Sequence, residues 1–177
     1  MTETITALRA RPVVVPMRRP LATAGGAVSE APLVLVDVET SGGITGRAYS
    51  FAYHAWALKP IMAMYDVLAE KITGRPLDPA AVQADLWAAF RLAGAKGAAG
   101  QAISGLDMAL WDAAAKAKGL PLYKALGAEA AATPAYNSKG LGMIGAEAAG
   151  KEARDLLDEG FGAVKVRLGY PTLEEDV

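Results

Sequence analysis

The chain contains no cysteine and only one histidine among its 177 residues. Without thiols it can form no disulfide framework, no cysteine-ligated zinc site and no cysteine nucleophile. The opening residues, MTETITALRARP, carry charges where a secretory signal needs an apolar core. Nothing in the composition therefore requires an oxidising compartment or export, and we expect a cytoplasmic protein.

The sequence also lacks long apolar runs and an excess of either charge. The longest apolar runs, 12–17 and 31–36, are far shorter than the ~20 residues needed to span a bilayer. Eighteen Lys and Arg residues stand against 19 Asp and Glu residues, so no basic surface for nucleic acid or an anionic membrane is expected. With 53% hydrophobic and 21% charged residues, the composition is typical of a globular protein that binds neither partner.

The first half of the chain combines three β-rich segments with three helical ones. The segments are 4–15, 32–39 and 44–52, and Gly42-Gly43 between the last two predicts a hairpin. Residues 18–28, which lie among prolines and glycines, are expected to form a loop, either a flexible flap or a plain surface connection. Helical spacing follows at 58–68, 82–93 and 98–118, with Gly119 at the C′ position of the last. This order predicts a small α+β domain with a three-stranded antiparallel sheet.

The pattern changes after Gly127. Strands are predicted at 133–138 and 163–168, with a helix at 143–159 between them and the start of another at 171–177, which makes one βαβ unit. A parallel sheet needs neighbours at its edges and helices on its faces. We therefore expect this unit either to close against another chain or to begin a barrel of ~250 residues. The predicted domains are 1–130 and 131–177.

Gly140, Gly142 and Gly145 form a literal G-x-G-x-x-G between the predicted strand and helix. Such glycines let the backbone approach a dinucleotide pyrophosphate, and Arg167 would occupy the position that reads a 2′-phosphate. The preceding strand, however, is short and polar where that fold needs a buried apolar strand. In a chain with 19 glycines, an accidental match is the favoured explanation.

Lys165 and Arg167 are the main candidate site residues. Residues two apart in a strand point to one face, and two cations on a covered face are costly unless that face opens onto a polar site. Ser138, at the end of the other strand, would share the rim where barrel active sites gather. The alternatives are two solvated cations at a strand end and a serine that forms a turn.

Other polar residues carry weaker signals. His54 has no visible Asp or Ser relay and is expected at the surface. Asp107 shares a helix face with Trp111, which favours a buried, hydrogen-bonded structural aspartate. Residues 174–176 are acids in the first turn of a helix, and none of these acids shows metal-ligand spacing.

Six stretches, in this order, resemble the mandelate racemase and muconate lactonizing enzyme branch of the enolase superfamily, with mandelate racemases nearest in pattern. They are APLVLVDV (31–38), FAY (51–53), GLDMALWDA (105–113), PLYKALG (121–127), AYNS (135–138) and GFGAVKVRLGYP (160–171). The resemblance implies an N-terminal α+β capping domain followed by a (β/α)₇β barrel, of which only the first two strands and the first helix are present.

The resemblance also implies a chemistry and a set of site residues. Members of this branch abstract the proton α to a carboxylate and hold the resulting enediolate on Mg²⁺. By position, Lys165 matches the first lysine of the family's K-x-K motif, near the substrate carboxylate, and Arg167 matches the second, the base. Ser138 matches a serine that contacts the carboxylate. The positions that match the wall of the substrate pocket are Leu21, Gly25, Val28 and Tyr53.

Two departures from the family pattern bear on function. An arginine side chain stays protonated and is a poor general base, so Arg167 could instead orient a sugar acid while a base on the opposite barrel face takes the proton, as in acid-sugar dehydratases. The Mg²⁺ ligands are expected beyond residue 177. The resemblance thus implies a racemase or dehydratase of a 2-hydroxy acid or sugar acid, often a homo-oligomer. The alternative is a non-catalytic capping or oligomerisation domain, and the 177 residues alone are expected to be inactive.

Overall fold

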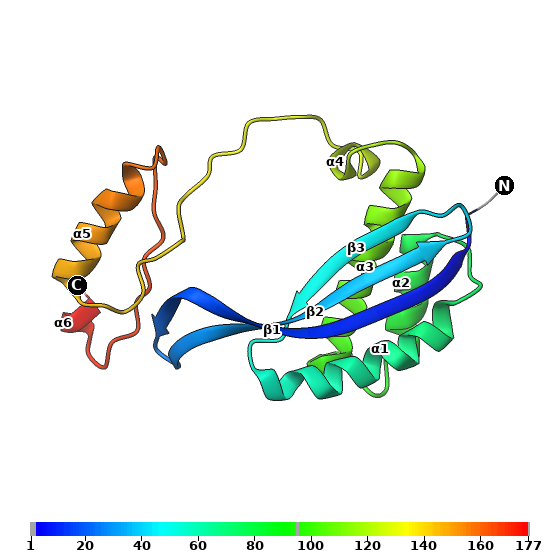
Figure 1. Ribbon diagram of the computed structural model, residues 1–177, viewed down its shortest axis with the longest axis horizontal. Helices are drawn as coiled ribbons and strands as arrows, with labels where there is room; N and C mark the ends of the chain where they lie inside the picture. Colours follow the sequence, from blue (N-terminus) through cyan, green and yellow to red (C-terminus); the bar gives the residue numbers. More distant parts are fainter. Residues whose placement is uncertain (1–2, 95, 177) are drawn as a thin grey trace. The chain divides into compact units, whose positions relative to one another are not determined.

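A computed structural model describes residues 3–94 and 96–176 (Figure 1). The chain divides into two compact units. The first consists of Met1–Val15 with Ala31–Ala130, and the second of Pro16–Glu30 with Ala131–Val177.

The sheet of the first unit is antiparallel and has the strand order β1-β2-β3. Its strands are β1 (Ile5–Thr23), β2 (Gly26–Thr40) and β3 (Thr45–Phe51). In the β2–β3 pair, Leu33 lies opposite Phe51 and Glu39 opposite Thr45, which confirms the hairpin predicted from Gly42-Gly43. Along β2, alternate residues are buried, as expected for a strand with one covered face.

Three helices cover one face of this sheet (Figure 1). They are α1 (Leu58–Ile72), α2 (Pro79–Ala89) and α3 (Ala98–Ala117). The short η1 (Ala55–Ala57) precedes α1, and α4 (Leu122–Ala125) follows α3. Gly119 has φ +64°, which confirms its predicted C′ role at the end of α3. Among the described residues, no helix is both long and apolar enough to cross a membrane. The predicted α+β capping architecture is confirmed.

Two glycines set the close approach of α3 to β3 and α1. A Cβ on Gly46 of β3 would collide with the carbonyl oxygen of Ala109. A Cβ on Gly105 of α3 would collide with the hydroxyls of Tyr65 and Ser50. Those hydroxyls are buried and hydrogen-bond each other at 3.0 Å, and burial raises the pKa of Tyr65. The first residue of the GLDMALWDA stretch therefore has a packing role.

The predicted loop at 18–28 is wrong. β1 continues to Thr23 and β2 starts at Gly26, so only two residues form the turn. Pro16 and Pro20, with the glycines at 25 and 26, caused the error, because proline usually interrupts a sheet. Pro12, Pro16 and Pro20 all lie within β1. The three prolines are four residues apart, so the backbone nitrogens that lack a hydrogen all point to the same side of β1. β1 is an outer strand of the sheet, so one of its sides has no neighbouring strand.

The second unit contains the tip of the β1–β2 hairpin, α5 (Ala146–Leu157) and α6 (Leu173–Asp176). The two strands predicted at 133–138 and 163–168 are reduced to one parallel bridge between Asn137 and Val164. The reason is physical: residues 131–136 are exposed, and a strand pair with no covered face is marginal on its own. The helix expected at 143–159 starts at Ala146, three residues late.

Candidate functional site

The segment after the bridge carries the two candidate cations. The N–H of Lys165 donates to the carbonyl of Asn137 at 2.9 Å, and its side chain is exposed. The N–H of Arg167 donates to the carbonyl of Leu141 at 3.1 Å, and its guanidinium Nη1 donates to the carbonyl of Gly140 at 3.1 Å. Lys165 is thus open to a ligand, whereas Arg167 is half-buried and anchored to backbone.

Ser138 is exposed directly after the bridging residue Asn137. Asn137 is 5% exposed, and its amide Nδ2 donates to the carbonyl of Leu156 and to Glu159, both at 3.2 Å. Neighbouring residues in an extended segment point to opposite sides. Because the Asn137 side chain contacts α5, the Ser138 side chain is expected to point away from α5.

Asn137 and Glu159 belong to an anchoring network that the sequence did not reveal. Lys139 donates to both carboxylate oxygens of Glu159, at 2.9 and 3.1 Å, and this pairing lowers the pKa of Glu159. The one available signal was a polar residue inside a predicted strand. This network fixes the backbone on which Ser138 lies.

The hairpin tip brings three more candidate residues into the second unit. The carbonyl of Ala22 accepts from the N–H of Met143 at 3.0 Å, and a Cβ on Gly142 would lie only 2.9 Å from that carbonyl oxygen. A Cβ on Gly169 would lie 3.0 Å from Cβ of Ala24. The tip therefore packs directly on the turn that Arg167 contacts. The candidate pocket residues on this tip are half-buried Leu21 and Val28 and exposed Gly25.

Tyr53, the remaining candidate, belongs to the first unit. It is 67% exposed, its ring lies 4.6 Å from that of Phe51, and its φ of +63° is rare for a bulky residue. Together with Trp87, Gln101 and Met108 it lines a surface cavity of about 580 Å³. Such a strained, exposed aromatic residue is typical of a binding position rather than of a core.

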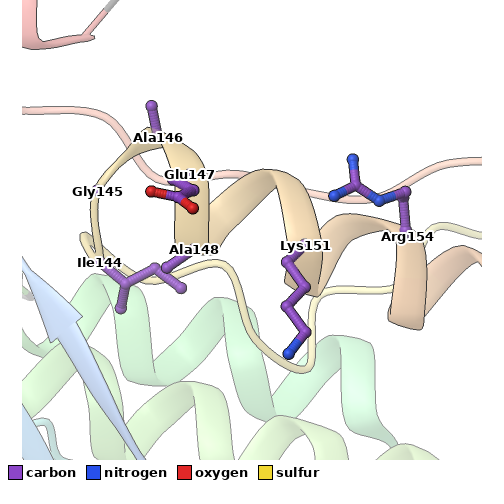
Figure 2. Close-up of a pocket in the computed structure, with 7 residues that line it drawn as sticks. All are labelled: Ile144, Gly145, Ala146, Glu147, Ala148, Lys151 and Arg154. Carbon is purple, nitrogen blue, oxygen red and sulfur yellow. The ribbon is translucent and has the colours of Figure 1, made fainter.

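A separate cavity of about 540 Å³ lies at the start of α5 (Figure 2). None of the predicted site residues lines it. The side chains of Lys151 and Arg154 extend in different directions in Figure 2, so they do not converge on one anion. The N–H of Gly145 donates to the hydroxyl of Tyr170 at 2.7 Å. We do not assign the reaction to this cavity.

The geometry also opposes a dinucleotide at the glycine-rich turn. Oε2 of Glu152 accepts from the N–H of Leu141 at 2.8 Å, and a Cβ on Gly140 would lie 2.5 Å from Oε1. A carboxylate thus occupies the approach that a pyrophosphate would need, and like charges repel. This favours the accidental explanation of the motif.

The remaining polar candidates, His54 and Asp107, belong to no metal site in the described part of the chain. His54 is exposed and stacks on Trp56, as expected. Asp107 was expected to be hydrogen-bonded, which is wrong: within the described part of the chain its buried Oδ1 has no partner, and burial raises its pKa. Residues 3–94 and 96–176 contain no cluster of three or more His, Asp or Glu side chains able to bind a metal. We therefore assign no metal ligand to them.

Known proteins similar to this chain include several sugar-acid dehydratases. It is 31% identical to L-talarate/galactarate dehydratase of Salmonella typhimurium over 153 residues, which cover 85% of this chain and 38% of the relative. It is 32% identical to arabinonate dehydratase of Saccharolobus solfataricus, covering 90% of this chain and 43% of the relative. The chain thus spans less than half the length of these relatives.

Solved structures with the same fold bind magnesium and organic acids. An enolase from Bradyrhizobium, complexed with magnesium and mandelic acid, has a TM-score of 0.90 and 41% identity, covering 99% of this chain and 48% of that one. The Salmonella typhimurium dehydratase, liganded with Mg and L-lyxarohydroxamate, has a TM-score of 0.87 and 27% identity, covering 99% and 47%.

The family is established by its own domain model. The model of the mandelate racemase/muconate lactonizing enzyme N-terminal domain matches residues 5–127, which is most of the chain and includes the whole sheet and α1 to α4. The relatives and solved structures are enolase-superfamily enzymes. The chain therefore belongs to the mandelate racemase/muconate lactonizing enzyme family of the enolase superfamily.

Proposed function

We propose that the full-length protein is a Mg²⁺-dependent enzyme that abstracts the α-proton of a 2-hydroxy carboxylate. The observation that carries the proposal is the juxtaposition of Lys165, Arg167 and Ser138 with the hairpin tip in one compact unit. The chain is 41% identical to an enolase whose structure holds magnesium and mandelic acid, which supports an aromatic 2-hydroxy acid as the first substrate class to test.

Each residue has a defined task in this proposal. The Lys165 ammonium pairs with the substrate carboxylate and stabilises the negative charge that develops on it when the α-proton leaves. The Ser138 hydroxyl donates a hydrogen bond to the same carboxylate. Leu21 and Val28 exclude water over the reacting carbon, and Gly25 lets the turn approach the substrate. Tyr53, in the first unit, is the remaining position that the family pattern matches to the pocket wall.

Bound magnesium would supply electrostatic stabilisation of the negative charge that develops on the substrate. The described residues offer no ligand set for it, so we expect its ligands beyond residue 177. In this assignment residues 1–130 form the capping domain and 131–177 begin the barrel. We also expect the full-length protein to be cytoplasmic and homo-oligomeric, and the 177-residue chain alone to be inactive or to serve only capping and oligomerisation.

A second candidate function is dehydration of an acid sugar. Arg167 favours it, because a protonated guanidinium held by the Gly140 carbonyl is suited to orient hydroxyls or a second carboxylate rather than to accept a proton. The similarity to talarate/galactarate and arabinonate dehydratases supports it too. In that reaction the α-proton and the β-hydroxyl leave as water, and the resulting enol becomes a 2-keto acid.

Product analysis separates the two candidates. The Mg²⁺-loaded full-length protein is incubated with each mandelate enantiomer and with galactarate, L-talarate and arabinonate. Appearance of the opposite enantiomer identifies a racemase, and a 2-keto product identifies a dehydratase. Lys165→Ala should reduce either activity by about 100-fold or more, since it removes a charge partner from the developing anion. Lys151→Ala on the surface of α5 is the matched control. Conversion of none of these acids would contradict both candidates.

A further inference from the structure

A strained turn at residues 140–143 is held by an acidic side chain of α5. Oε2 of Glu152 accepts from the N–H of Leu141 at 2.8 Å, and Gly140 lies so close to the carboxylate that only glycine fits. Leu141 has φ +54°, in the left-handed region that costs a non-glycine residue free energy, and its side chain is 1% exposed. Glu152 therefore stabilises a turn that would otherwise relax.

The same turn holds two parts of the candidate site that Glu152 does not itself hydrogen-bond. Arg167 donates to it twice, from its guanidinium to the Gly140 carbonyl and from its N–H to the Leu141 carbonyl. Met143 donates its N–H to the carbonyl of Ala22, next to Leu21 in the hairpin tip. Among the contacts of the described residues, Glu152 is linked to the guanidinium and the tip through this turn and through one ion pair.

That ion pair joins Glu152 to the hairpin directly. Nη1 of Arg19 lies 3.7 Å from Oε1 of Glu152, and the two side chains are 59% and 28% exposed. A pair at this distance and exposure contributes little, whereas a hydrogen bond from an N–H to a carboxylate is among the stronger ones. The hydrogen bond to Leu141 is therefore the main contribution of Glu152.

We propose that Glu152 is a positioning residue of the substrate site: by holding the 140–143 turn, it fixes the Arg167 guanidinium and the hairpin tip that covers the substrate. The effect of Glu152 on catalysis rests on the proposed function. The positioning itself is a property of the second unit and can be measured without substrate.

The first experiment measures amide hydrogen exchange in the ¹⁵N-labelled chain. Glu152→Ala should accelerate exchange at Leu141 and also at Met143 by about tenfold, the change that corresponds to one lost hydrogen bond of about 1.4 kcal/mol. Glu152→Gln keeps a carbonyl oxygen that can accept, and should retain most of the protection even if the alanine variant is unfolded. Glu147→Ala, an exposed acid on the same helix, is the control. Acceleration confined to Leu141, or equal acceleration in the control, would overturn the proposal.

The second experiment uses the Mg²⁺-loaded full-length enzyme and the acid on which it acts. Glu152→Ala should lower kcat/KM by about tenfold, and Glu152→Gln should restore most of it. In an Arg167→Ala background, Glu152→Ala should cause a smaller further loss than in the natural enzyme, because the part of its effect that acts through the guanidinium is already removed. Additive losses would overturn the proposal. Absence of activity in the unmodified enzyme would contradict the proposed function instead, while the exchange experiment still decides the role of Glu152.

Discussion

Replacing Gly105 by alanine reverses a usual rule of helix stability. In the interior of an exposed helix, glycine to alanine stabilises by roughly 0.5–1 kcal/mol. Here the added methyl group collides with the hydroxyls of Tyr65 and Ser50. Overpacking of a core costs about 1–3 kcal/mol, and displacing the buried hydrogen bond between the two hydroxyls costs about 1 kcal/mol more. We expect a net destabilisation of about 1–3 kcal/mol.

Urea unfolding followed by tryptophan fluorescence measures this change, because Trp56, Trp87 and Trp111 all lie in the first unit. Gly150→Ala in α5 is the matched control: nothing lies within 4 Å of the position a Cβ would take, and Gly150 belongs to the second unit, so the tryptophan signal of the first unit should unfold at an unchanged urea concentration.

A second variant tests the collision itself. Tyr65→Phe removes one of the two colliding hydroxyls, so Gly105→Ala should cost less in that background than in the natural chain. A neutral or stabilising Gly105→Ala, or a cost of Gly105→Ala that Tyr65→Phe leaves unchanged, would contradict the collision.

Three further predictions concern acids of the first unit. Asp107→Asn should raise the free energy of unfolding at pH 7, by about 1 kcal/mol, because the buried Oδ1 has no partner in the described structure. Burial raises the pKa of Asp107 above its ordinary value of 3.8 in the folded state, so the folded protein loses stability as the pH rises from below 3.8 through the folded-state pKa. The advantage of asparagine over aspartate should therefore disappear below about pH 3, where both states bind the proton. Urea unfolding at several pH values tests this. Asp112→Ala should cost about 1–2 kcal/mol by urea unfolding, since Asp112 accepts from the N–H of Arg47 at 2.7 Å and from Lys116. Asp78→Ala should cost about 1 kcal/mol in the same assay, because its side chain caps α2 through the N–H of Ala81, whereas Asp78→Asn should be nearly neutral.

Local patterns in the first unit were enough to predict its three strands and the helices α1 to α3, but not the short η1 and α4. Gly42-Gly43 marked the hairpin, the helical spacing marked α1 to α3, and Gly119 marked the end of α3. These signals act over a few residues and do not depend on distant contacts. The prolines of β1 misled because their effect depends on which strand lies at the sheet edge, and that is a property of the whole sheet.

The second unit was harder to predict for a related reason. A βαβ pattern predicts strands only if neighbouring strands complete the sheet, and here the pair is a single bridge between Asn137 and Val164. Lys165, Arg167 and Ser138 became candidates because of their positions in the predicted strands, and the resemblance in motif order then implied a role for each. The contacts of Glu152 depend on the tertiary arrangement of a turn, and no spacing in the sequence predicts them.

In the proposed function, the full-length protein removes the α-proton of a 2-hydroxy carboxylate. The most direct measurement is ¹H NMR of mandelate, and of galactarate, incubated with the Mg²⁺-loaded full-length protein in D₂O. We expect the α-proton signal of at least one acid to disappear, either by exchange with solvent deuterium or by conversion to product, and Lys165→Ala to slow this loss by about 100-fold or more. An unchanged α-proton signal for these acids and for a wider panel of aromatic 2-hydroxy acids, aldonates and aldarates would contradict the proposed function.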